Sequence, residues 1–476
     1  MRFAILHRFS WLLGAHVWRE ILQTVFLLAL ARSNSTAYGE VMLAFQFGAI
    51  LLFLSEAGLN PYLADQLTHD PERKLAWLRR LAAVRLALLL LAGLGVWIFI
   101  RAQGYSPRLQ WLVLGLGGAI GLESLAGTFF IGLQVAGKQA VESRIRGWAA
   151  TLGWGYGLAA LAAGWGVFRI SLCKWIETLF SLVGAARAAG SDGRPVGSAG
   201  AWRPLGAVWR ESLPFAWLAV AAILFNKANV LFLQRLAGSE AVAQYSATWQ
   251  LVDAIPILVS NLLLGRVLYP LFTGQWRADR PALARLILQT VRWLSLTAGV
   301  VALTLALGSE PLIRLLYGPA YREAARLQPV LAWTIPFALL HNTAAYLLLA
   351  AGRRRFLVLA YGAALALNLA LCRFLMPAHP LSGAVWAMVL TKGCLTVTTV
   401  AAASRLLPFW RLATLGELLA VALAGGLAYW AAAPILGVGA LLLAWMPAAG
   451  LAWRWWKEPA RQSPPDSEPR ASGSSG

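Results

Sequence analysis

The chain alternates long apolar stretches with short polar or charged breaks along its whole length. A helix of about 20 apolar residues crosses the ~30 Å hydrocarbon core of a bilayer, and the stretches have about this length. The pattern therefore predicts about fourteen membrane-spanning helices, although two connections are so short that twelve spans remain an alternative. The predicted spans lie near residues 9–30, 38–63, 77–100, 109–136, 148–168, 170–188, 210–234, 242–272, 285–308, 327–351, 356–376, 382–403, 413–432 and 435–454.

Composition supports this interpretation and fixes the fold class as an all-α polytopic membrane protein. Of the 476 residues 59% are hydrophobic and only 13% are charged, whereas soluble domains carry about 25% charged residues. The first apolar stretch contains Arg19 and Glu20 and continues into a second span, so it does not have the pattern of a cleavable signal peptide. The cysteines are scattered, which predicts neither a disulfide framework nor a metal site.

Basic residues are distributed unequally between the two sides of the predicted bundle. If the N-terminus is cytoplasmic, 26 of the 41 Lys and Arg residues face the cytoplasm. This bias predicts an even number of spans with both termini cytoplasmic. The basic residues behind the net charge of +21 are therefore expected to set the membrane topology and to contact anionic lipid headgroups, not to bind nucleic acid. The nine cations on the opposite side are Arg32, Arg101, Arg108, Arg169, Arg235, Arg314, Arg322, Arg326 and Arg373.

The array of spans divides near its middle at a stretch rich in Gly, Ser and Pro. Tyr38 and Tyr245, at an offset of 207, begin similar segments after a long helix and a polar turn, which indicates two parallel repeats. The last twenty residues are rich in Pro, Ser and charge and are expected to be disordered. The predicted units are an N-terminal six-helix bundle (1–188), a cytoplasmic linker (189–208), a second six-helix bundle (209–405), two additional C-terminal helices (406–456) and a cytoplasmic tail (457–476).

Charged residues inside the spans are candidates for function, because a charge in hydrocarbon is costly. Arg19 and Lys227 lie at least one turn from their helix ends and occupy the lead helices of the two bundles. A positive cavity between the bundles favours an anionic ligand, for which phosphate is the natural group in a membrane carrier. Candidate cavity residues are Arg19, Lys227, Asn226, Asn229 and Arg266, and candidate counter-ions or sites of Na⁺ or H⁺ coupling are Asp253 and Glu20.

Other features suit scaffold roles or exclude functions. Lys174 and Glu177 are spaced to pair on one helix, and Arg85 is close enough to a helix end for its charge to reach the interface. The chain has no phosphate-binding glycine loop, which argues against ATP hydrolysis. The histidines are isolated, which predicts no metal or other cofactor. It also lacks the large outer loop with paired acids that a membrane glycosyltransferase or polymerase needs, so an enzyme is disfavoured.

The second half contains recognisable sequence motifs. From Pro311 it reads PLIRLLYGPAYREAARLQPVLAWTIPFALLHNTAAYLLLAAGRRRF. This segment resembles the oligosaccharide flippase, or polysaccharide transporter, family of the multidrug/oligosaccharidyl-lipid/polysaccharide superfamily, which includes O-antigen flippases. The opening pair of spans is similar too, at Tyr38, Gly39, Glu56 and Gly58. In the second half the matching residues are Leu316, Tyr317, Gly318, Tyr321, Ala324, Ala351, Gly352, Arg353, Asn368, Pro377, Gly383 and Ala384.

The resemblance implies fourteen helices in two bundles with alternating access to a central cationic cavity. It further implies that a polyprenyl-pyrophosphate-linked oligosaccharide moves from the cytoplasmic to the outer leaflet of the bacterial inner membrane, for lipopolysaccharide or another surface polysaccharide. Partners would be a polysaccharide polymerase or glycosyltransferases. Cavity residues vary within the family, so Arg19 and Lys227 rest on the charge argument alone. A lipid II flippase and a multidrug/cation antiporter of the same superfamily remain alternatives.

Overall fold

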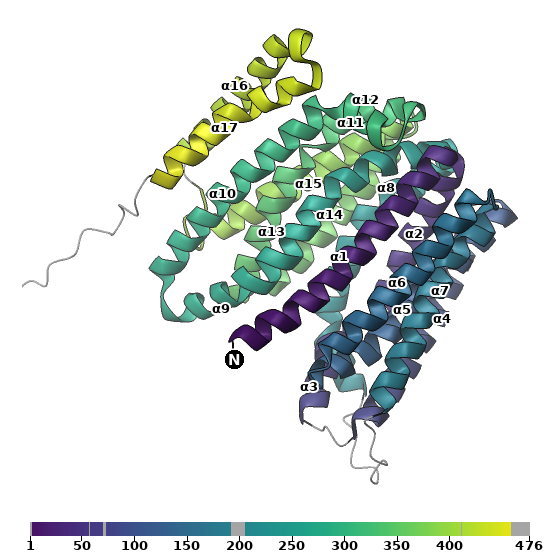
Figure 1. Ribbon diagram of the computed structural model, residues 1–476. Coiled ribbons are helices and arrows are strands. Elements are labelled where there is room, and N and C mark those ends of the chain that lie inside the picture. The colour runs from purple at the N-terminus through teal and green to yellow at the C-terminus, as the bar shows by residue number, and fades with distance from the viewer. Residues whose placement is uncertain (1, 57, 70–72, 192–204, 411, 458–476) are drawn as a thin grey trace, which may run out of the picture.

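The computed structural model describes residues 2–56, 58–69, 73–191, 205–410 and 412–457, and every regular element in these ranges is a helix (Figure 1). The first part comprises α1 (Arg2–Ser33), α2 (Ser35–Glu56), α3 (Leu59–His69), α4 (Lys74–Ala102), α5 (Pro107–Val135), α6 (Gln139–Ala162) and α7 (Val167–Gly190). The second comprises α8 (Leu205–Val259), the π-helix η2 (Ser260–Leu268), α9 (Tyr269–Ala278), α10 (Arg280–Leu307), α11 (Ser309–Leu316), η3 (Pro319–Tyr321), α12 (Arg322–Leu331), α13 (Thr334–Ala350), α14 (Arg354–Leu375) and α15 (Pro380–Ser404). The last helices are α16 (Leu412–Leu436), η4 (Gly437–Gly439) and α17 (Ala440–Lys457).

Each of the fourteen predicted spans overlaps one or more helices. Two of them share α8, which bends at Gly238, where φ is 75° and ψ is −172°. Within the described residues, eight helical segments are long and apolar enough to cross a membrane, and the bent pair α12–α13 makes a ninth. Two of the eight have 59 and 45 residues, which is enough for two crossings each. The all-α polytopic fold is therefore confirmed.

Two predicted spans differ from the observed helices. The predicted span 38–63 is wrong at its end, because α2 stops at Glu56 and the separate helix α3 follows Gly58, whose φ of 70° favours glycine. The predicted span 327–351 consists of α12 and α13, which meet at 45°. Pro336 in the first turn of α13 has no N–H to continue the hydrogen bonding of α12.

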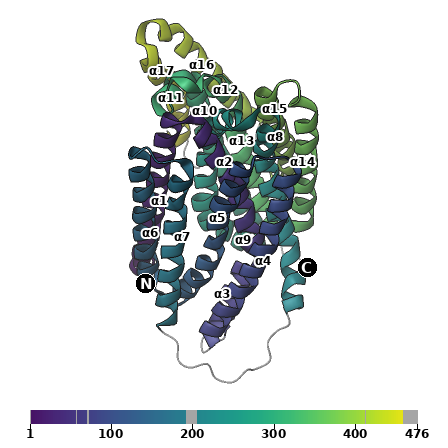
Figure 2. The same ribbon diagram turned by 90° about the vertical axis from the view of Figure 1, so that its right-hand side faces the viewer.

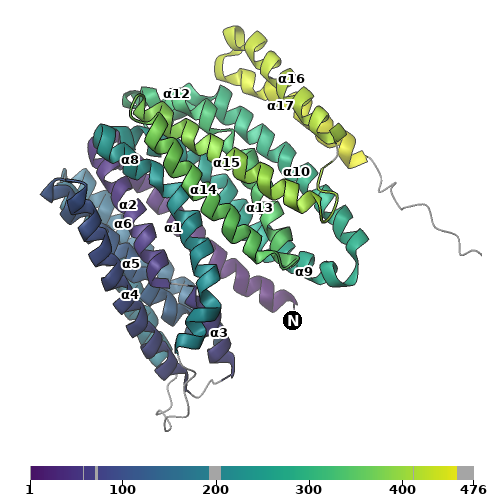
Figure 3. The ribbon, with the colours of Figure 1, turned by 180° about the vertical axis from the view of Figure 1, so that it is seen from behind.

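The helices pack in two groups, here called the N-lobe (α1–α7) and the C-lobe (α8–α15) (Figures 1 and 3). In the N-lobe α2 packs on α5, and α6 packs on α1 and α7. In the C-lobe α15 packs on α13 and α14, and α8 packs on α14. The main contact between the lobes joins α2 to α8, while the hairpin of α16 and α17 packs on α10 at the outside of the C-lobe.

The two ends of the bundle differ. The short helices α11, η3 and α12 lie at one end with the turn between α1 and α2, and α3 lies at the opposite end (Figure 2). We call these the α11 end and the α3 end. Most of the predicted linker (192–204) and nearly all of the predicted tail (458–476) lie outside the described residues.

Candidate functional site

Four charged side chains of the N-lobe meet in one cluster, although they come from three helices. Arg19 of α1 donates from Nε to Glu177 Oε1 of α7 at 2.5 Å and from Nη2 to Glu123 Oε1 of α5 at 2.9 Å. Lys174 of α7 donates to Glu177 Oε2 at 2.7 Å and also pairs with Glu123. We call these four residues the N-lobe cluster.

The N-lobe cluster has no net charge, because two cations face two carboxylates. Lys174 and Glu177 form the pair that their spacing predicts, and both are buried. Arg19 therefore has two carboxylate partners within its own lobe and needs no ligand to balance it. Such a network is costly to break, since removing one member leaves a buried charge without compensation. The arrangement suits a brace between α1, α5 and α7.

Arg85 of α4 is a second buried charge of the N-lobe, with no exposed surface. Its guanidinium donates to the carbonyl of Ser124 at 2.7 Å and to Thr128 Oγ1 at 2.9 Å, and it also bonds to Asn60 Oδ1. The prediction that its charge reaches the interface is wrong. Partners on α3 and α5, which sequence spacing does not reveal, bind both terminal nitrogens of the guanidinium inside the lobe.

A second cluster lies in the C-lobe, where α8 faces α15. Lys392 Nζ of α15 lies 3.6 Å from Asp253 Oδ1 of α8, so the two side chains form an ion pair. Lys392 Nζ also lies 4.5 Å from the centre of the Trp249 ring, at a distance typical of a cation–π contact. The Trp249 ring in turn stacks on Tyr245 with 6.0 Å between centroids and 8° between planes. The Lys392–Asp253 pair therefore lies beside two buried, stacked aromatic rings.

Lys227, on the first half of α8, adds the second cation of this cluster. It is half-buried and lies within electrostatic range of Asp253 and Lys392. Within the described parts of the chain it forms no ion pair or hydrogen bond. Its neighbour Asn226 donates to the carbonyl of Ala222 in its own helix at 2.7 Å, and its buried Oδ1 has no hydrogen-bond partner among the described residues. The C-lobe cluster (Lys227, Asp253, Lys392) has a net charge of +1.

The remaining predicted site residues occupy different surroundings. Asn229 is fully buried and donates to the carbonyl of Ala384 at 2.5 Å, so it links α8 to α15. Arg266, in the π-helix η2, and Glu20, on α1, are exposed. Sequence reasoning did not select Lys392 for the site, although its position in the middle of a predicted span was the available signal.

The lobes are joined by hydrogen bonds and ring contacts at the α11 end. Ser35 Oγ of α2 donates to Glu240 Oε2 of α8 at 2.7 Å, and the Gln250 amide donates to Met42 Sδ at 3.4 Å. The contacting residues increase in residue number along α2 and along the second half of α8 alike. These two segments therefore run in the same direction. The Tyr321 hydroxyl donates to the carbonyl of Ala31 at 3.2 Å.

Gly39 permits the closest approach between these two helices. A Cβ at this position would lie 2.8 Å from the carbonyl carbon of Ser239 and 3.2 Å from the nitrogen of Ala243, and closer still to the Ser239 carbonyl oxygen. Tyr38 packs beside it against the rings of Tyr317 and Tyr321, with centroids 6.1 and 6.2 Å away. The α11 end is therefore closed by backbone and aromatic packing.

Solved structures with the same fold are membrane transporters of one superfamily. The lipid II flippase MurJ in an inward closed conformation superposes with a TM-score of 0.74 at 11% identity, over 94% of this chain and 98% of MurJ. An inward-facing multidrug resistance transporter of the MATE family and MOP superfamily superposes with a TM-score of 0.59 at 13% identity, over 84% of this chain and 95% of the transporter. A MOP superfamily transporter from Pyrococcus furiosus superposes with a TM-score of 0.55 at 13% identity, over 84% of this chain and 95% of that transporter. It is described by the reverse polarity of its binding pocket, which is said to suggest a different function.

Sequence comparison identifies the family. No curated protein sequence matches the chain significantly. The family model described as MatE matches residues 218–374. The model described as polysaccharide biosynthesis protein matches residues 5–276, which is more than half of the chain and includes all of the N-lobe except the first residues of α1. With this match the chain belongs to the polysaccharide biosynthesis protein family, and it has the fold of multi-pass membrane transporters.

Proposed function

We propose that this protein is a flippase that moves a polyprenyl-pyrophosphate-linked oligosaccharide from the cytoplasmic to the outer leaflet of the bacterial inner membrane. It acts by alternating access, with both termini cytoplasmic, and its product supplies a polysaccharide polymerase or glycosyltransferases at the cell surface. The positive-inside bias of the loops puts the α3 end in the cytoplasm and the α11 end outside.

The net positive C-lobe cluster is the observation that carries this proposal. Among the described residues Lys227 forms no ion pair or hydrogen bond, so a phosphate beside it gains a charge-assisted hydrogen bond without breaking an existing one. The buried, stacked rings of Trp249 and Tyr245 support the Lys392 ammonium from one side. In this proposal Lys227 and Lys392 bind the pyrophosphate, and Arg19, which already has two carboxylates, braces the N-lobe.

Closure at the α11 end supports alternating access. With the outer end held by α2, α8 and η3, substrate enters from the cytoplasmic leaflet. Release to the outer leaflet then requires separation of Gly39 from Ser239 and of Tyr38 from its two tyrosine neighbours. Because these contacts lie between lobes, separating them leaves each lobe intact.

The charge of the C-lobe cluster separates this proposal from cation antiport. A cationic drug favours a cavity with excess carboxylates, whereas here two lysines face one aspartate. For the neighbour from Pyrococcus furiosus, too, the reverse polarity of the binding pocket is said to suggest a different function. Lipid II, the substrate named for MurJ, is also a polyprenyl-pyrophosphate sugar and forms the second candidate.

Transport by the purified protein tests the proposal. The protein is reconstituted with a fluorescent polyprenyl-pyrophosphate oligosaccharide, and an impermeant quencher reports the fraction in the outer leaflet. We expect K227A and K392A to slow movement roughly ten- to hundredfold, since each loses a charged hydrogen bond of about 1.5–3 kcal/mol. K227R, which keeps the charge, should retain most activity. R373A, which removes an exposed cation of the same lobe, is the control.

Three results would count against the proposal. Failure of the wild-type protein to move any polyprenyl-pyrophosphate sugar rejects a flippase function. Ethidium efflux that depends on Asp253 supports the antiporter instead. If K227A and K392A transport the lipid as fast as R373A does, the C-lobe cluster does not bind the substrate. Comparison of the oligosaccharide lipid with lipid II in the same vesicles separates the two flippase candidates.

A further inference from the structure

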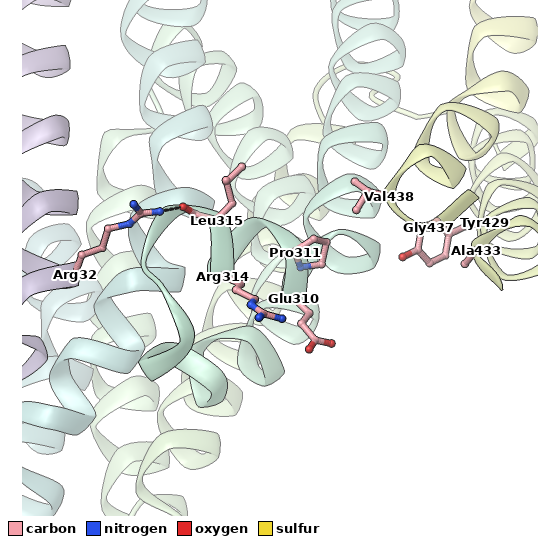
Figure 4. Close-up of a pocket in the computed structure, with 9 residues that line it drawn as sticks. All are labelled: Arg32, Glu310, Pro311, Arg314, Leu315, Tyr429, Ala433, Gly437 and Val438. Carbon is pink, nitrogen blue, oxygen red and sulfur yellow. Dashed lines mark hydrogen bonds between the residues drawn. The ribbon is translucent and has the colours of Figure 1, made fainter. Parts of the chain in front are cut away.

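A pocket of about 650 Å³ opens at the α11 end, between the last turn of α1, helix α11 and the tip of the α16–α17 hairpin (Figure 4). It shares no lining residue with the N-lobe cluster or the C-lobe cluster. Its volume lies in the range of small-molecule sites. Two of the few cations on this side of the membrane, Arg32 and Arg314, line it.

The charged wall of the pocket has a net charge of +1. Arg32 donates from Nε to the carbonyl of Leu316 at 2.9 Å and from Nη2 to that of Leu315, so the end of α11 holds its guanidinium in place. Glu310 and Arg314 lie one turn apart on α11 and both are exposed. Across the described segments neither of them forms an ion pair. Two arginines and one glutamate thus face the space.

The opposite wall of the pocket is apolar. It is formed by the hairpin, where Tyr429 donates its hydroxyl to the carbonyl of Leu307 at 3.0 Å and so fixes α16 against α10. Beyond Tyr429 the hairpin tip presents Val438, which is 57% exposed, and Ile435, which is 85% exposed. Such side chains are stable when lipid rather than water covers them. The pocket therefore joins a cationic wall to an apolar edge at the level of the membrane surface.

From this combination we infer that the pocket binds the phosphodiester headgroup of an anionic phospholipid in the leaflet at the α11 end. The guanidinium of Arg314, with that of Arg32, presents the N–H groups that match phosphate oxygens, and the acyl chains lie along the hairpin tip. The charge balance favours a phosphodiester, because its single negative charge equals the excess of the wall. A pyrophosphate would bring at least two negative charges. This inference does not depend on which lipid the protein transports.

Lipid binding to the full-length protein in detergent, measured by native mass spectrometry, tests the inference. The probes are phosphatidylglycerol and zwitterionic phosphatidylcholine. R314Q is the main variant, because it removes one wall charge and leaves the Arg32 bonds to α11 intact. R322Q removes the same charge from α12 at the same end but outside the pocket, and is the matched control. E310Q removes the negative charge of the wall.

We expect the wild-type protein to prefer phosphatidylglycerol, R314Q to bind it about tenfold or more weakly, and R322Q to bind it as the wild type does. E310Q should bind it more tightly. Equal weakening by R314Q and R322Q would overturn the inference, because it would indicate general surface attraction. Equal binding of phosphatidylcholine would also overturn it. Tighter, Arg314-dependent binding of polyprenyl pyrophosphate would overturn the phosphodiester assignment and make the pocket a site for the transported lipid.

Discussion

Replacement of Gly39 by alanine is expected to open the α11 end. The new methyl group would lie 2.8 Å from the Ser239 carbonyl carbon and 3.2 Å from the Ala243 nitrogen. Both are backbone atoms, which cannot move aside as a flexible side chain does. Overpacking of this kind costs about 1–3 kcal/mol. Because the contact joins two lobes, the cost applies to the closed arrangement, so the ratio of open to closed molecules should rise about five- to 150-fold.

Spin labels at Ser33 of α1 and Ala237 of α8 report this change, since both are exposed and lie at the α11 end. The exposed Cys394 is first replaced by serine so that only the new cysteines react. Electron–electron resonance then gives the distribution of label distances in wild type and G39A, and we expect a longer population in G39A. G118A is the control, because a Cβ on Gly118 has nothing within 4 Å. Identical distributions in G39A and G118A would refute the reasoning.

Three further predictions concern buried and interlobe charges. R85L should lower stability by about 1–3 kcal/mol, because Asn60 Oδ1 loses its donor and the Ser124 carbonyl and Thr128 Oγ1 each lose a charged one; thermal unfolding of R85L no earlier than that of the exposed control R79L would contradict this. E177A should cost about 3–5 kcal/mol in the same assay, whereas E323A, which breaks an exposed pair of the same i,i+3 spacing, should cost at most about 1. E240Q weakens the exposed bonds from α2 and should lengthen the spin-label distance less than the glycine replacement does; an equal or larger shift would contradict the primary role of backbone packing.

The spans could be predicted from sequence because hydrophobic length has a direct physical meaning in a bilayer. Local interruptions were harder to see. Gly58 was noted only as part of the family resemblance and not as a helix end, yet it has a positive φ between α2 and α3, where the hydrophobic pattern continues to residue 63. The π-helix η2, which packs against α13, had no sequence signal either, because the hydrophobic pattern does not distinguish it from an α-helix.

The candidate site could be predicted as a set of buried charges but not as a set of pairs. Lys174 and Glu177 share one helix, so their spacing was sufficient to pair them. Arg19 meets Glu123 across 104 positions in sequence, and that contact depends on the rotation of α1 and α5 about their axes. The same limit explains why Lys392, 139 positions from Asp253, was not assigned to the site.

The N-lobe cluster also constrains how the sequence can evolve. Each carboxylate of Glu123 and Glu177 contacts both Arg19 and Lys174. Loss of any one residue therefore leaves two others under-compensated inside the membrane, and no single substitution elsewhere restores the balance. A change of charge at one of these four positions is therefore expected to persist only when a second position changes charge in the opposite sense. Among homologues, the four positions should covary as a group, and this covariation records a contact among α1, α5 and α7.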